Sequence, residues 1–405
     1  YSLSVKTRNM FFLATAVLLS MSLWFSASAV VPQLAEEWSL STSMQAWMTM
    51  SVQLGFVAGA LFSAILNLSD RFSAPRVVAF SATLGAIFNA CIPLFSEGPE
   101  SALVFRFLTG AMLAGVYPPG MKIMASWCKE DRGKCIGMLV AALTLGSGMP
   151  HLLKALSAAS TALPMWHQVL YGTSVQSLIA AAIALFLIQS GPHLGQTAQF
   201  DWRQATSGLT DRPTRLANFG YFGHMWELYA MWAWVPVMLL VSYRAAGYSD
   251  TAAGLAAFGV FAAGGAGSFL AGIWADKIGR TRITSIALGV SGTCCLIAGL
   301  FLNQPILLTM VCLIWGVAVI ADSAQFSAAV SELADSRYVG TALQVQTSLG
   351  FLLTLVTLQL TPILIDKVGF EWVFLLLIPG PIVGIVSMLK LRNDPRSSQM
   401  ASGNR

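Results

Sequence analysis

Two ionisable side chains lie in the middle of a strongly apolar segment, residues 220–234, whose sequence is GYFGHMWELYAMWAW. His224 and Glu227 are three residues apart, so a helix would place them on one face. An imidazole and a carboxyl group can hydrogen-bond a polar ligand, and both can take up or release a proton. This chemistry is ordinary in a water-soluble core but costly in lipid, so the surroundings of the segment decide what it means.

The composition indicates a membrane protein. Hydrophobic residues make up 56% of the 405 residues and charged residues 10%, whereas a soluble domain has about 45–50% and about 25%. Apolar runs of about 18 or more residues recur along the chain, and each can cross a hydrocarbon core of about 30 Å as a helix. The lipid bilayer is therefore the expected surrounding of residues 220–234.

We predict twelve membrane-spanning helices with no folded soluble domain between them. Their expected ranges are 10–31, 44–66, 75–95, 101–127, 135–159, 167–189, 216–241, 251–274, 283–302, 306–330, 340–364 and 371–391. We expect the first range to be an uncleaved helix and not a signal peptide. Because the chain begins at Tyr1 and not at Met, we also expect native residues to precede it.

The basic residues predict the orientation of these spans. If both termini are cytoplasmic, all of the 23 Lys and Arg residues lie on that side except five, namely Arg106, Lys122 and Lys154 within spans and Arg244 and Lys367 on the opposite side. This bias follows the positive-inside rule. We therefore expect a multi-pass inner-membrane protein with cytoplasmic termini, and the net charge of +5 requires no nucleic-acid partner.

A polar stretch with Gly, Pro and mixed charges, residues 190–215, divides the spans into two sets of six. We interpret it as a cytoplasmic linker. The expected organisation is thus an N-terminal six-helix bundle at 1–189, a C-terminal bundle at 216–391 and a cytoplasmic tail at 392–405.

Related sequences follow the second and eighth spans, LNLSDRFSAPR (66–76) and GIWADKIGRTR (272–282), as in a transporter built from two related halves. The second copy resembles the loop signature Gly-x-Leu-Ala-Asp-Arg-x-Gly-Arg-Arg of the major facilitator superfamily. The first copy is degenerate, with Leu66 and Ser73 where the family has Gly. RFLTGAMLAG (106–115) is similar to the family's fourth-span pattern.

The resemblance covers the whole chain and implies an all-α membrane protein, with twelve transmembrane helices in two six-helix halves. It also implies a secondary active transporter. The sequence as a whole is similar to cyanate-type and related anion porters. The repeated loops and the charge near the second one give the expected gating residues Asp70, Arg71, Gly272, Asp276, Lys277, Gly279, Arg280 and Arg337.

An Asp at a helix connection can accept the free N–H groups of a neighbouring helix, for roughly 0.3–2 kcal/mol. We expect Asp276 to bind the start of the span near Gly340, with Arg337 close by. We expect Asp70 to bind the start of the span near Ile136. Such contacts can form in one conformation and break in another, although solvated loop charges are the simpler alternative.

Five charged residues within spans are functional candidates, because a charge at the bilayer centre costs about 2.5–3.5 kcal/mol on insertion scales. The two acids are Glu227 and Asp322, and with His224 they form the expected proton-coupling group. We expect His224 to be the partner of Glu227 or a hydrogen bonder of the substrate. A buried His–Glu pair that locks two helices is the structural alternative.

The three cations within spans all lie in the first six spans, and their positive charges would attract an anion. Lys122 and Lys154 lie near span ends, where they could also snorkel to the membrane surface. The expected substrate-binding residues are Arg106, Lys122, His151, Lys154, Tyr221 and Trp232.

The sequence predicts a transporter of a small polar or anionic organic solute, coupled to protons, without a cofactor and active as a monomer. A proton-driven exporter of drugs or amphipathic metabolites and a membrane receptor or sensor are the alternatives. TLGSGMPHLL (144–153) lacks the Gly-Pro-x-x-Gly-Gly of drug exporters. No HExxH or GxSxG motif indicates an enzyme. The six cysteines lack CxxC spacing and are expected to be packing residues.

Overall fold

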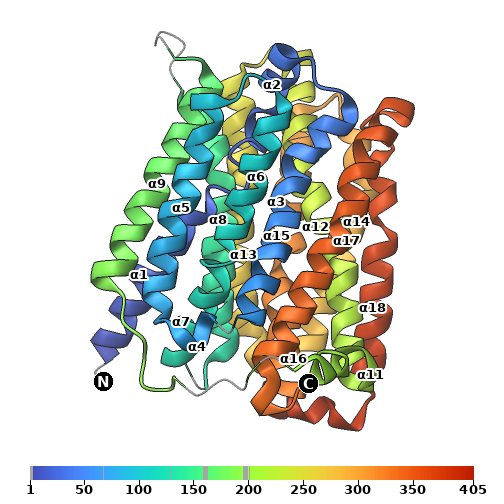
Figure 1. Ribbon diagram of the computed structural model, residues 1–405. Helices are drawn as coiled ribbons and strands as arrows, with labels where there is room; N and C mark the ends of the chain where they lie inside the picture. Colours follow the sequence, from blue (N-terminus) through green and yellow to red (C-terminus); the bar gives the residue numbers. More distant parts are fainter. Residues whose placement is uncertain (1–2, 67, 129, 158–162, 195–198, 200) are drawn as a thin grey trace.

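The computed structural model describes the chain except for residues 1–2, 67, 129, 158–162, 195–198 and 200. The described part is a bundle of helices and contains no strand (Figure 1). Eleven helical segments in it are long and apolar enough to cross a membrane. This confirms the predicted all-α membrane fold class.

The first membrane segment differs from its prediction because it is broken. We expected one helix at 10–31, but α1 (Leu3–Met21) ends at Met21 and residues 22–27 form turns. A 3-10 turn, η1 (Ser28–Val30), and α2 (Val31–Trp38) then complete the crossing. Counted together with the eleven long apolar helices, this broken segment is consistent with the twelve predicted crossings.

The helices that precede residue 190 are called the first half below, and those that follow residue 211 the second half. The remaining helices of the first half are α3 (Thr42–Ile65), α4 (Leu68–Arg71), α5 (Ala74–Phe95), α6 (Pro99–Leu113), α7 (Tyr117–Trp127), α8 (Arg132–Leu156) and α9 (Met165–Leu187). Those of the second half are α12 (Arg212–Ala245), α13 (Asp250–Ile278), α14 (Arg280–Ile297), α15 (Pro305–Ala321), α16 (Ser323–Leu333), α17 (Val339–Val368) and α18 (Pro379–Arg392).

Short elements occupy the connections. The 3-10 turns are η2 (Ala298–Phe301), η3 (Ser336–Tyr338), η4 (Val373–Leu377), η5 (Pro395–Gln399) and η6 (Ala401–Gly403). The expected linker at 190–215 contains α10 (Trp202–Ala205) and α11 (Ser207–Thr210), and α12 already begins within it. Pro213 in the first turn explains this early start, because its missing N–H is not needed there.

The two halves meet mainly where α3 packs against α17 and α8 against α13. Glycines allow the close approach of α8 and α13. A Cβ atom on Gly272 would lie 2.6 Å from the carbonyl oxygen of Gly133, and one on Gly137 would lie 3.0 Å from that of Ser268. Small residues at membrane helix interfaces let the backbones pack closely in this way.

Helix breaks occur at equivalent places in the two halves. The fourth crossing is broken between α6 and α7 at residues 114–116, and the tenth between α15 and α16 at Asp322. A break leaves backbone polar groups without helical partners, which a membrane protein tolerates only where they are buried in protein or line a cavity. In transporters, broken helices surround the binding site, so these breaks direct attention to the centre of the bundle.

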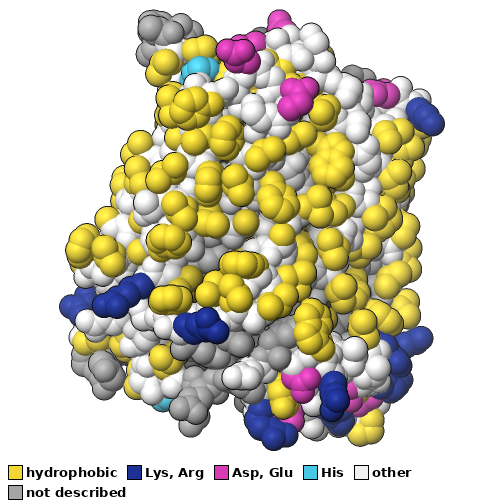
Figure 2. Space-filling model, in the orientation of Figure 1, with side chains coloured by type: hydrophobic (Ala, Val, Ile, Leu, Met, Phe, Trp, Pro, Cys, Tyr) yellow, Lys and Arg dark blue, Asp and Glu magenta, His cyan; other side chains and the backbone are white. Residues whose placement is uncertain are grey.

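The surface separates into an apolar middle and two polar ends. Figure 2 shows hydrophobic side chains over the middle of the bundle and most of the visible Lys and Arg at the end where both termini lie. Phe62, Phe80 and Phe186 are among the large apolar side chains that are exposed. Such an extensive apolar surface suits lipid. The end that carries the termini is called the terminal end below, and the other the opposite end.

Candidate functional site

Buried aromatic rings from both halves meet at the break in the first membrane segment. Neighbouring rings have centroids 4.9–6.1 Å apart, which is the usual range for aromatic pairs. Together they are called the aromatic cluster, and its members are Trp24, Phe25, Phe56, Tyr229, Trp232, Phe261 and Phe351. The cluster lies half-way along α12, α13 and α17, so it occupies the middle of the bundle.

Polar atoms in and beside the aromatic cluster lack partners. The indole nitrogens of Trp24 and Trp232 are buried and have no hydrogen-bond partner within the described chain. Gln53, one turn before Phe56, donates its amide nitrogen to Thr354 Oγ1 at 3.0 Å, while its Oε1 is unpaired in the described structure. A buried polar atom without a partner costs about 1–3 kcal/mol. A ligand with polar substituents would satisfy these atoms.

Arg106 holds the broken segment in place. Its guanidinium group is fully buried and donates to the carbonyl oxygens of Leu23 (2.9 Å), Trp24 (2.5 Å) and Met48 (2.9 Å). It also lies 3.1 Å from Ser26 Oγ and 3.5 Å from Ser28 Oγ. An arginine has five N–H donors, and all five are used by these acceptors. Arg106 therefore holds the backbone at Leu23 and Trp24, and the substrate-binding role that we expected for it stays a prediction.

A pocket at the opposite end leads toward the aromatic cluster. It has an empty volume of about 400 Å³, open solvent included, and both halves line it. His151 of α8 stacks on Phe261 at 5.4 Å between ring centroids, so the imidazole joins the pocket to the cluster. Lys154, one turn further along α8, also lines the pocket.

Lys154 is available to an anionic ligand. No acceptor within the described residues forms a hydrogen bond or ion pair with its ammonium group. Asp250 lines the same pocket, but Arg244 holds that carboxylate with bonds of 2.9 and 2.7 Å. His151 and Lys154 thus offer one imidazole and one cation beside the aromatic cluster, and their role in substrate binding stays a prediction.

Two buried acidic groups lie near the tenth crossing. Asp322 stands at the break between α15 and α16, and its Oδ1 is 2.9 Å from His224 Nδ1. Glu227 Oε2 accepts the thiol of Cys295 at 2.8 Å and the indole N–H of Trp315 at 3.2 Å. The other oxygen, Oε1, is buried and unpaired with respect to the described residues.

These contacts correct the expected pairing of His224 with Glu227. A separation of three residues turns the side chains about 60° apart around the helix, and here they diverge to different neighbours. The imidazole meets Asp322, whereas the carboxyl group meets α14 and α15. All three residues lie in one region, as expected from the sequence. The pair in contact is His224 and Asp322, and not His224 and Glu227.

Tyr221 and Lys122 complete the expected substrate-binding residues. Tyr221 is buried with its ring 5.9 Å from that of His224, and it packs against Gly350, where a Cβ would lie 2.5 Å from the tyrosine ring. It therefore accompanies the His224–Asp322 pair and lies outside the aromatic cluster. Lys122 is half-buried on α7, away from the pocket that His151 and Lys154 line.

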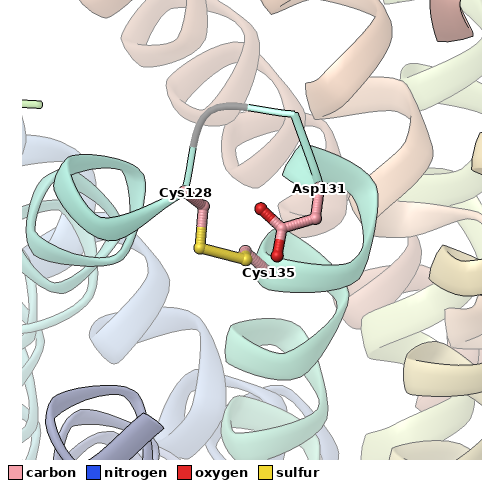
Figure 3. A group of neighbouring side chains, drawn as sticks. All are labelled: Cys128, Asp131 and Cys135. Carbon is pink, nitrogen blue, oxygen red and sulfur yellow. A yellow bond between two sulfur atoms is a disulfide. The ribbon is translucent and has the colours of Figure 1, made fainter. Parts of the chain in front are cut away.

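One group of side chains in the described structure has the residue types and spacing of a metal site. Its members are Cys128, Asp131 and Cys135, whose potential ligand atoms all lie within 4.8 Å of one another. The two cysteines are joined in a disulfide (Figure 3). We expected all six cysteines to be packing residues, and this pair is an exception, because the turn between α7 and α8 brings their side chains together.

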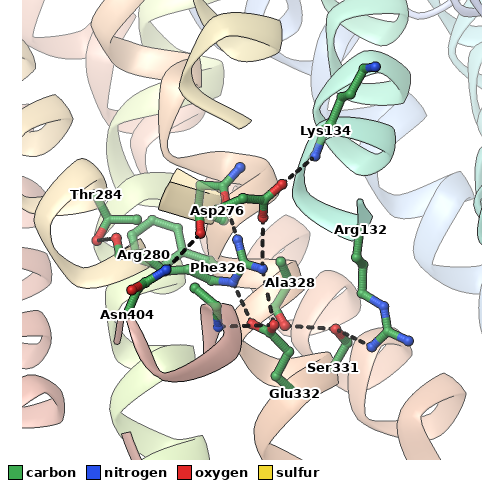
Figure 4. A network of polar contacts seen from close by, with 12 residues as sticks. Arg132, Lys134, Asp276, Arg280, Thr284, Phe326, Ala328, Ser331, Glu332 and Asn404 are labelled. Atoms are coloured by element: carbon green, nitrogen blue, oxygen red, sulfur yellow. Dashed lines mark hydrogen bonds and ion pairs between the residues drawn. The ribbon is translucent and has the colours of Figure 1, made fainter. Parts of the chain in front are cut away.

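Asp276 links the two halves at the terminal end. Its Oδ2 accepts the backbone N–H of Lys134, near the start of α8, at 3.2 Å (Figure 4). Arg280 donates to Asp276 Oδ1 at 3.2 Å, to Gln325 Oε1 at 2.6 Å and to Glu332. Residues 272–282, called the gating loop below, therefore contact the first half through Asp276 and α16 of the second half through Arg280.

This geometry corrects the expected partner of Asp276. We expected the helix that starts near Gly340, with Arg337 close by, whereas the contact is with α8. The reason is that α13 packs against α8 of the other half. Arg337 instead pairs with Asp335 at 3.2 Å, and both are exposed.

The remaining gating residues have simpler surroundings. Arg71 and Lys277 are exposed at the ends of α4 and α13. Gly279 ends α13 at a φ of 115°, a conformation that favours glycine. The side chain of Asp70 lies outside the part of the chain that the structure describes, so its expected contact with α8 stays a prediction.

The tail packs onto the gating loop, which the sequence did not predict. We expected residues 392–405 to be a cytoplasmic tail, but Met400 is fully buried. The backbone N–H of Ala401 donates to Glu332 Oε2 at 3.1 Å, and the side chain of Asn404 donates to the carbonyl oxygen of Asp276 at 3.0 Å. The tail contains few apolar residues, so hydropathy carried no signal of this docking.

Comparisons with known proteins identify the class. The family model described as Major Facilitator Superfamily matches residues 12–352 and 217–404. The chain therefore belongs to the Major Facilitator Superfamily, as the loop signature predicted. Family membership also confirms that it is a transport protein and not an enzyme.

The relatives narrow the class to transporters of small organic solutes. The chain is 27% identical over 329 residues to the 4-hydroxybenzoate transporter PcaK of Acinetobacter baylyi, covering 72% of this chain and 70% of the relative. It is 24% identical over 242 residues to the niacin transporter NiaP of the same organism, where it spans only 54% of the relative's length. The chain is accordingly a secondary transporter of small organic solutes.

Solved structures support the fold. The partially occluded inward-open xylose transporter XylE of E. coli superposes with a TM-score of 0.72 at 15% identity, covering 96% of this chain and 98% of that one. A bacterial homologue of the human lysosomal transporter Spinster superposes with a TM-score of 0.71 at 14% identity, covering 100% and 99%. At these identities the likeness concerns the fold alone.

Proposed function

We propose that the chain is a proton-coupled secondary active transporter that moves small aromatic carboxylates across the inner membrane by alternating access. The observation that carries this proposal is the aromatic cluster, to which both halves contribute and which lies beside His151 and Lys154. A ligand bound there touches both halves, so its binding can be coupled to their relative movement.

The aromatic cluster favours a planar ring as ligand. Each aromatic pair contributes about 0.5–1.5 kcal/mol beyond the apolar area that it buries. The unpaired indole N–H groups of Trp24 and Trp232 can donate to an oxygen or ring nitrogen. The relatives are named for 4-hydroxybenzoate and niacin, and each of these compounds carries one aromatic ring and one carboxyl group.

Lys154 and His151 are the proposed partners of the carboxylate. Lys154 lacks an acceptor among the residues described and lines the pocket at the opposite end. The imidazole of His151 lies between that pocket and the cluster, on Phe261. An anion that enters from the opposite end would meet the cation first and the rings next.

Glu227 and the His224–Asp322 pair are the proposed proton carriers. All three side chains are buried in the interior of the bundle, and His224 contacts Asp322. Glu227 Oε1 has no donor within the described structure, so it can bind a proton without losing a contact. Asp322 stands at a helix break, where a change of charge can alter the angle between α15 and α16.

Alternating access is supported by hydrogen bonds that join the two halves at both ends of the bundle. Asp276 joins Lys134 at the terminal end. At the opposite end Thr42 Oγ1 donates to Asp366 Oδ2 at 2.9 Å and Gln359 donates to Ser43 Oγ at 3.1 Å. Opening either end requires one set of these contacts to break while the other persists.

The proposed orientation places the terminal end in the cytoplasm, because basic residues gather there. The linker at 190–215 and both termini would then be cytoplasmic. Since one chain supplies all groups of the proposed site, we expect the monomer to transport.

Ligand binding to the purified protein tests this proposal. Quenching of tryptophan fluorescence would be titrated with 4-hydroxybenzoate and with nicotinate, because Trp24 and Trp232 lie in the proposed site. Two matched controls separate the contribution of the aromatic ring from that of the carboxylate. Nicotinamide has the ring without the charge, and cyclohexanecarboxylate has the charge without the aromatic ring. We expect both controls to bind more weakly than both aromatic carboxylates.

If nicotinamide or an aromatic cation bound more tightly than 4-hydroxybenzoate and nicotinate, this would contradict the role of Lys154 as a carboxylate partner. It would favour an exporter of amphipathic compounds. Binding without exchange of labelled ligand across liposome membranes would favour a receptor. Lys154→Gln should lower the affinity for the carboxylates and leave the affinity for nicotinamide unchanged. An equal loss of affinity for charged and neutral ligands would show that Lys154 does not bind the carboxylate.

A further inference from the structure

We propose that Gln53 selects the solute by accepting a hydrogen bond from a hydroxyl group on its aromatic ring, at the end of the ring opposite the carboxylate. The preferred solutes are then aromatic carboxylates that carry such a hydroxyl group. This inference rests on the proposed function, because it assumes that an aromatic carboxylate binds at the aromatic cluster. It adds which substituent the ring carries and which residue recognises it.

The side chain of Gln53 is a buried hydrogen-bond acceptor with a fixed orientation. Gln53 is fully buried, and its amide nitrogen donates to Thr354 Oγ1 at 3.0 Å. The hydroxyl group of Thr354 has a single proton, which it donates to the carbonyl oxygen of Phe351 at 2.5 Å. Thr354 Oγ1 can therefore only accept from Gln53, so the amide nitrogen must face it. This leaves Gln53 Oε1 as a buried acceptor that no donor in the described structure binds.

This free oxygen lies beside one end of the aromatic cluster, where the two halves meet. Gln53 and Phe56 are one turn apart on α3, and Thr354 and Phe351 are one turn apart on α17. The rings of Phe56 and Phe351 have centroids 4.9 Å apart, and the ring of Trp24 lies 5.3 and 5.2 Å from them. The amide group therefore adjoins these three rings.

The proposed partners of the carboxylate lie at another end of the aromatic cluster. His151 stacks on Phe261 at 5.4 Å, and Lys154 lines the adjoining pocket. Phe261 belongs to α13, which packs against α8, whereas Gln53 belongs to the separate contact between α3 and α17. A planar solute that lies along the cluster therefore reaches Lys154 with one edge and Gln53 with the opposite edge.

The unpaired atoms at the cluster differ in hydrogen-bonding chemistry. The indole nitrogens of Trp24 and Trp232 can only donate, and Gln53 Oε1 can only accept. A hydroxyl substituent carries a proton that Gln53 can bind. A fluorine atom, an ether oxygen or a ring nitrogen offers no proton and would leave Oε1 unpaired. A site that leaves a buried polar group unpaired binds the wrong ligand less well, so Gln53 discriminates between these substituents.

Calorimetric titration of the purified full-length protein in detergent tests the inference with four ligands. Benzoate lacks the hydroxyl group, 4-fluorobenzoate replaces it by an atom that cannot donate, and 3-hydroxybenzoate moves it to another edge of the ring. We expect 4-hydroxybenzoate to bind about 2–10 times more tightly than each of these three, as one hydrogen bond predicts. This comparison needs no variant, so it does not depend on whether a substitution at Gln53 folds.

Gln53→Leu should bind benzoate like the parent but lose the preference for 4-hydroxybenzoate. Gln359→Leu is a matched control, because the amide of Gln359 also joins the halves, through Ser43 at 3.1 Å, and its Oε1 is likewise unpaired among the described residues. Gln359 lies at the opposite end, away from the aromatic cluster, so this variant should keep the preference.

Equal affinity of the parent for 4-hydroxybenzoate and benzoate would overturn the inference, as would a preference that persists in Gln53→Leu. Equally tight binding of 3-hydroxybenzoate would contradict the placement of the hydroxyl group opposite the carboxylate. If all four benzoates bind alike and more tightly than cyclohexanecarboxylate, the proposed function stands and only the role of Gln53 is wrong. If none of them binds, the proposed function fails, and the role of Gln53 fails with it.

Discussion

Replacement of Arg106 by Gln should destabilise the protein more than it impairs recognition of the solute. The guanidinium group supplies donors to the carbonyl oxygens of Leu23, Trp24 and Met48. Each buried acceptor that loses its donor costs about 1–3 kcal/mol, while interhelical hydrogen bonds in a membrane protein average about 0.6 kcal/mol. For three carbonyl oxygens these values give a loss of about 2–9 kcal/mol.

Arg106→Lys keeps the charge but has a single nitrogen with three donors, so it cannot reach all of these acceptors from one position. Thermal unfolding in detergent should therefore rank the parent as most stable, Arg106→Lys as intermediate and Arg106→Gln as least stable. Arg71→Gln removes an exposed positive charge and should leave the melting temperature unchanged. If Arg106→Gln melts like the parent and loses only affinity for the carboxylate, Arg106 is a substrate residue and the positioning role is wrong.

Three further predictions concern coupling, gating and orientation. Glu227→Gln should still exchange solute across liposome membranes but should not accumulate it in a pH gradient, and normal accumulation would exclude Glu227 as the proton carrier. Asp276→Asn should bind solute normally yet transport it more slowly, because the contact with Lys134 loses its charge; a proportional loss of both would indicate a folding role. In a functional variant without native cysteines, an impermeant thiol reagent added to intact cells should label a cysteine at Glu97 but not at Gln204, and the reverse pattern would invert the orientation.

The fold followed from simple features of the sequence. Length and spacing of the apolar runs located the helices, because each run must satisfy its backbone hydrogen bonds internally in lipid. The break after Met21 was not foreseen, because residues 22–27 are about as apolar as the predicted spans around them. What stabilises the break is a hydrogen bond from Arg106 of α6 to the carbonyl oxygen of Leu23. A contact of this kind depends on tertiary structure that hydropathy does not encode.

The candidate site was predicted less completely, for the same physical reason. Residue type and depth identified His224, Glu227 and Asp322 as buried polar groups, but their partners depend on how α12 faces α14 and α15. The contribution of Trp24 and Phe56 to the aromatic cluster was likewise hidden, because aromatic residues are common in any membrane helix. We singled out His151 and Lys154 as candidates because a charge or imidazole within a span is rare.

Uptake of labelled 4-hydroxybenzoate into liposomes that contain the purified protein tests whether the chain is a proton-coupled transporter of aromatic carboxylates. With an imposed pH gradient, we expect 4-hydroxybenzoate to accumulate above its external concentration in the compartment of higher pH. Accumulation should be lost when a protonophore collapses the gradient. Trp232→Ala should abolish this uptake, because its ring lies in the aromatic cluster between Phe25, Tyr229 and Phe261. Equilibration without accumulation would contradict proton coupling, and undiminished uptake by Trp232→Ala would contradict the aromatic cluster as the binding site.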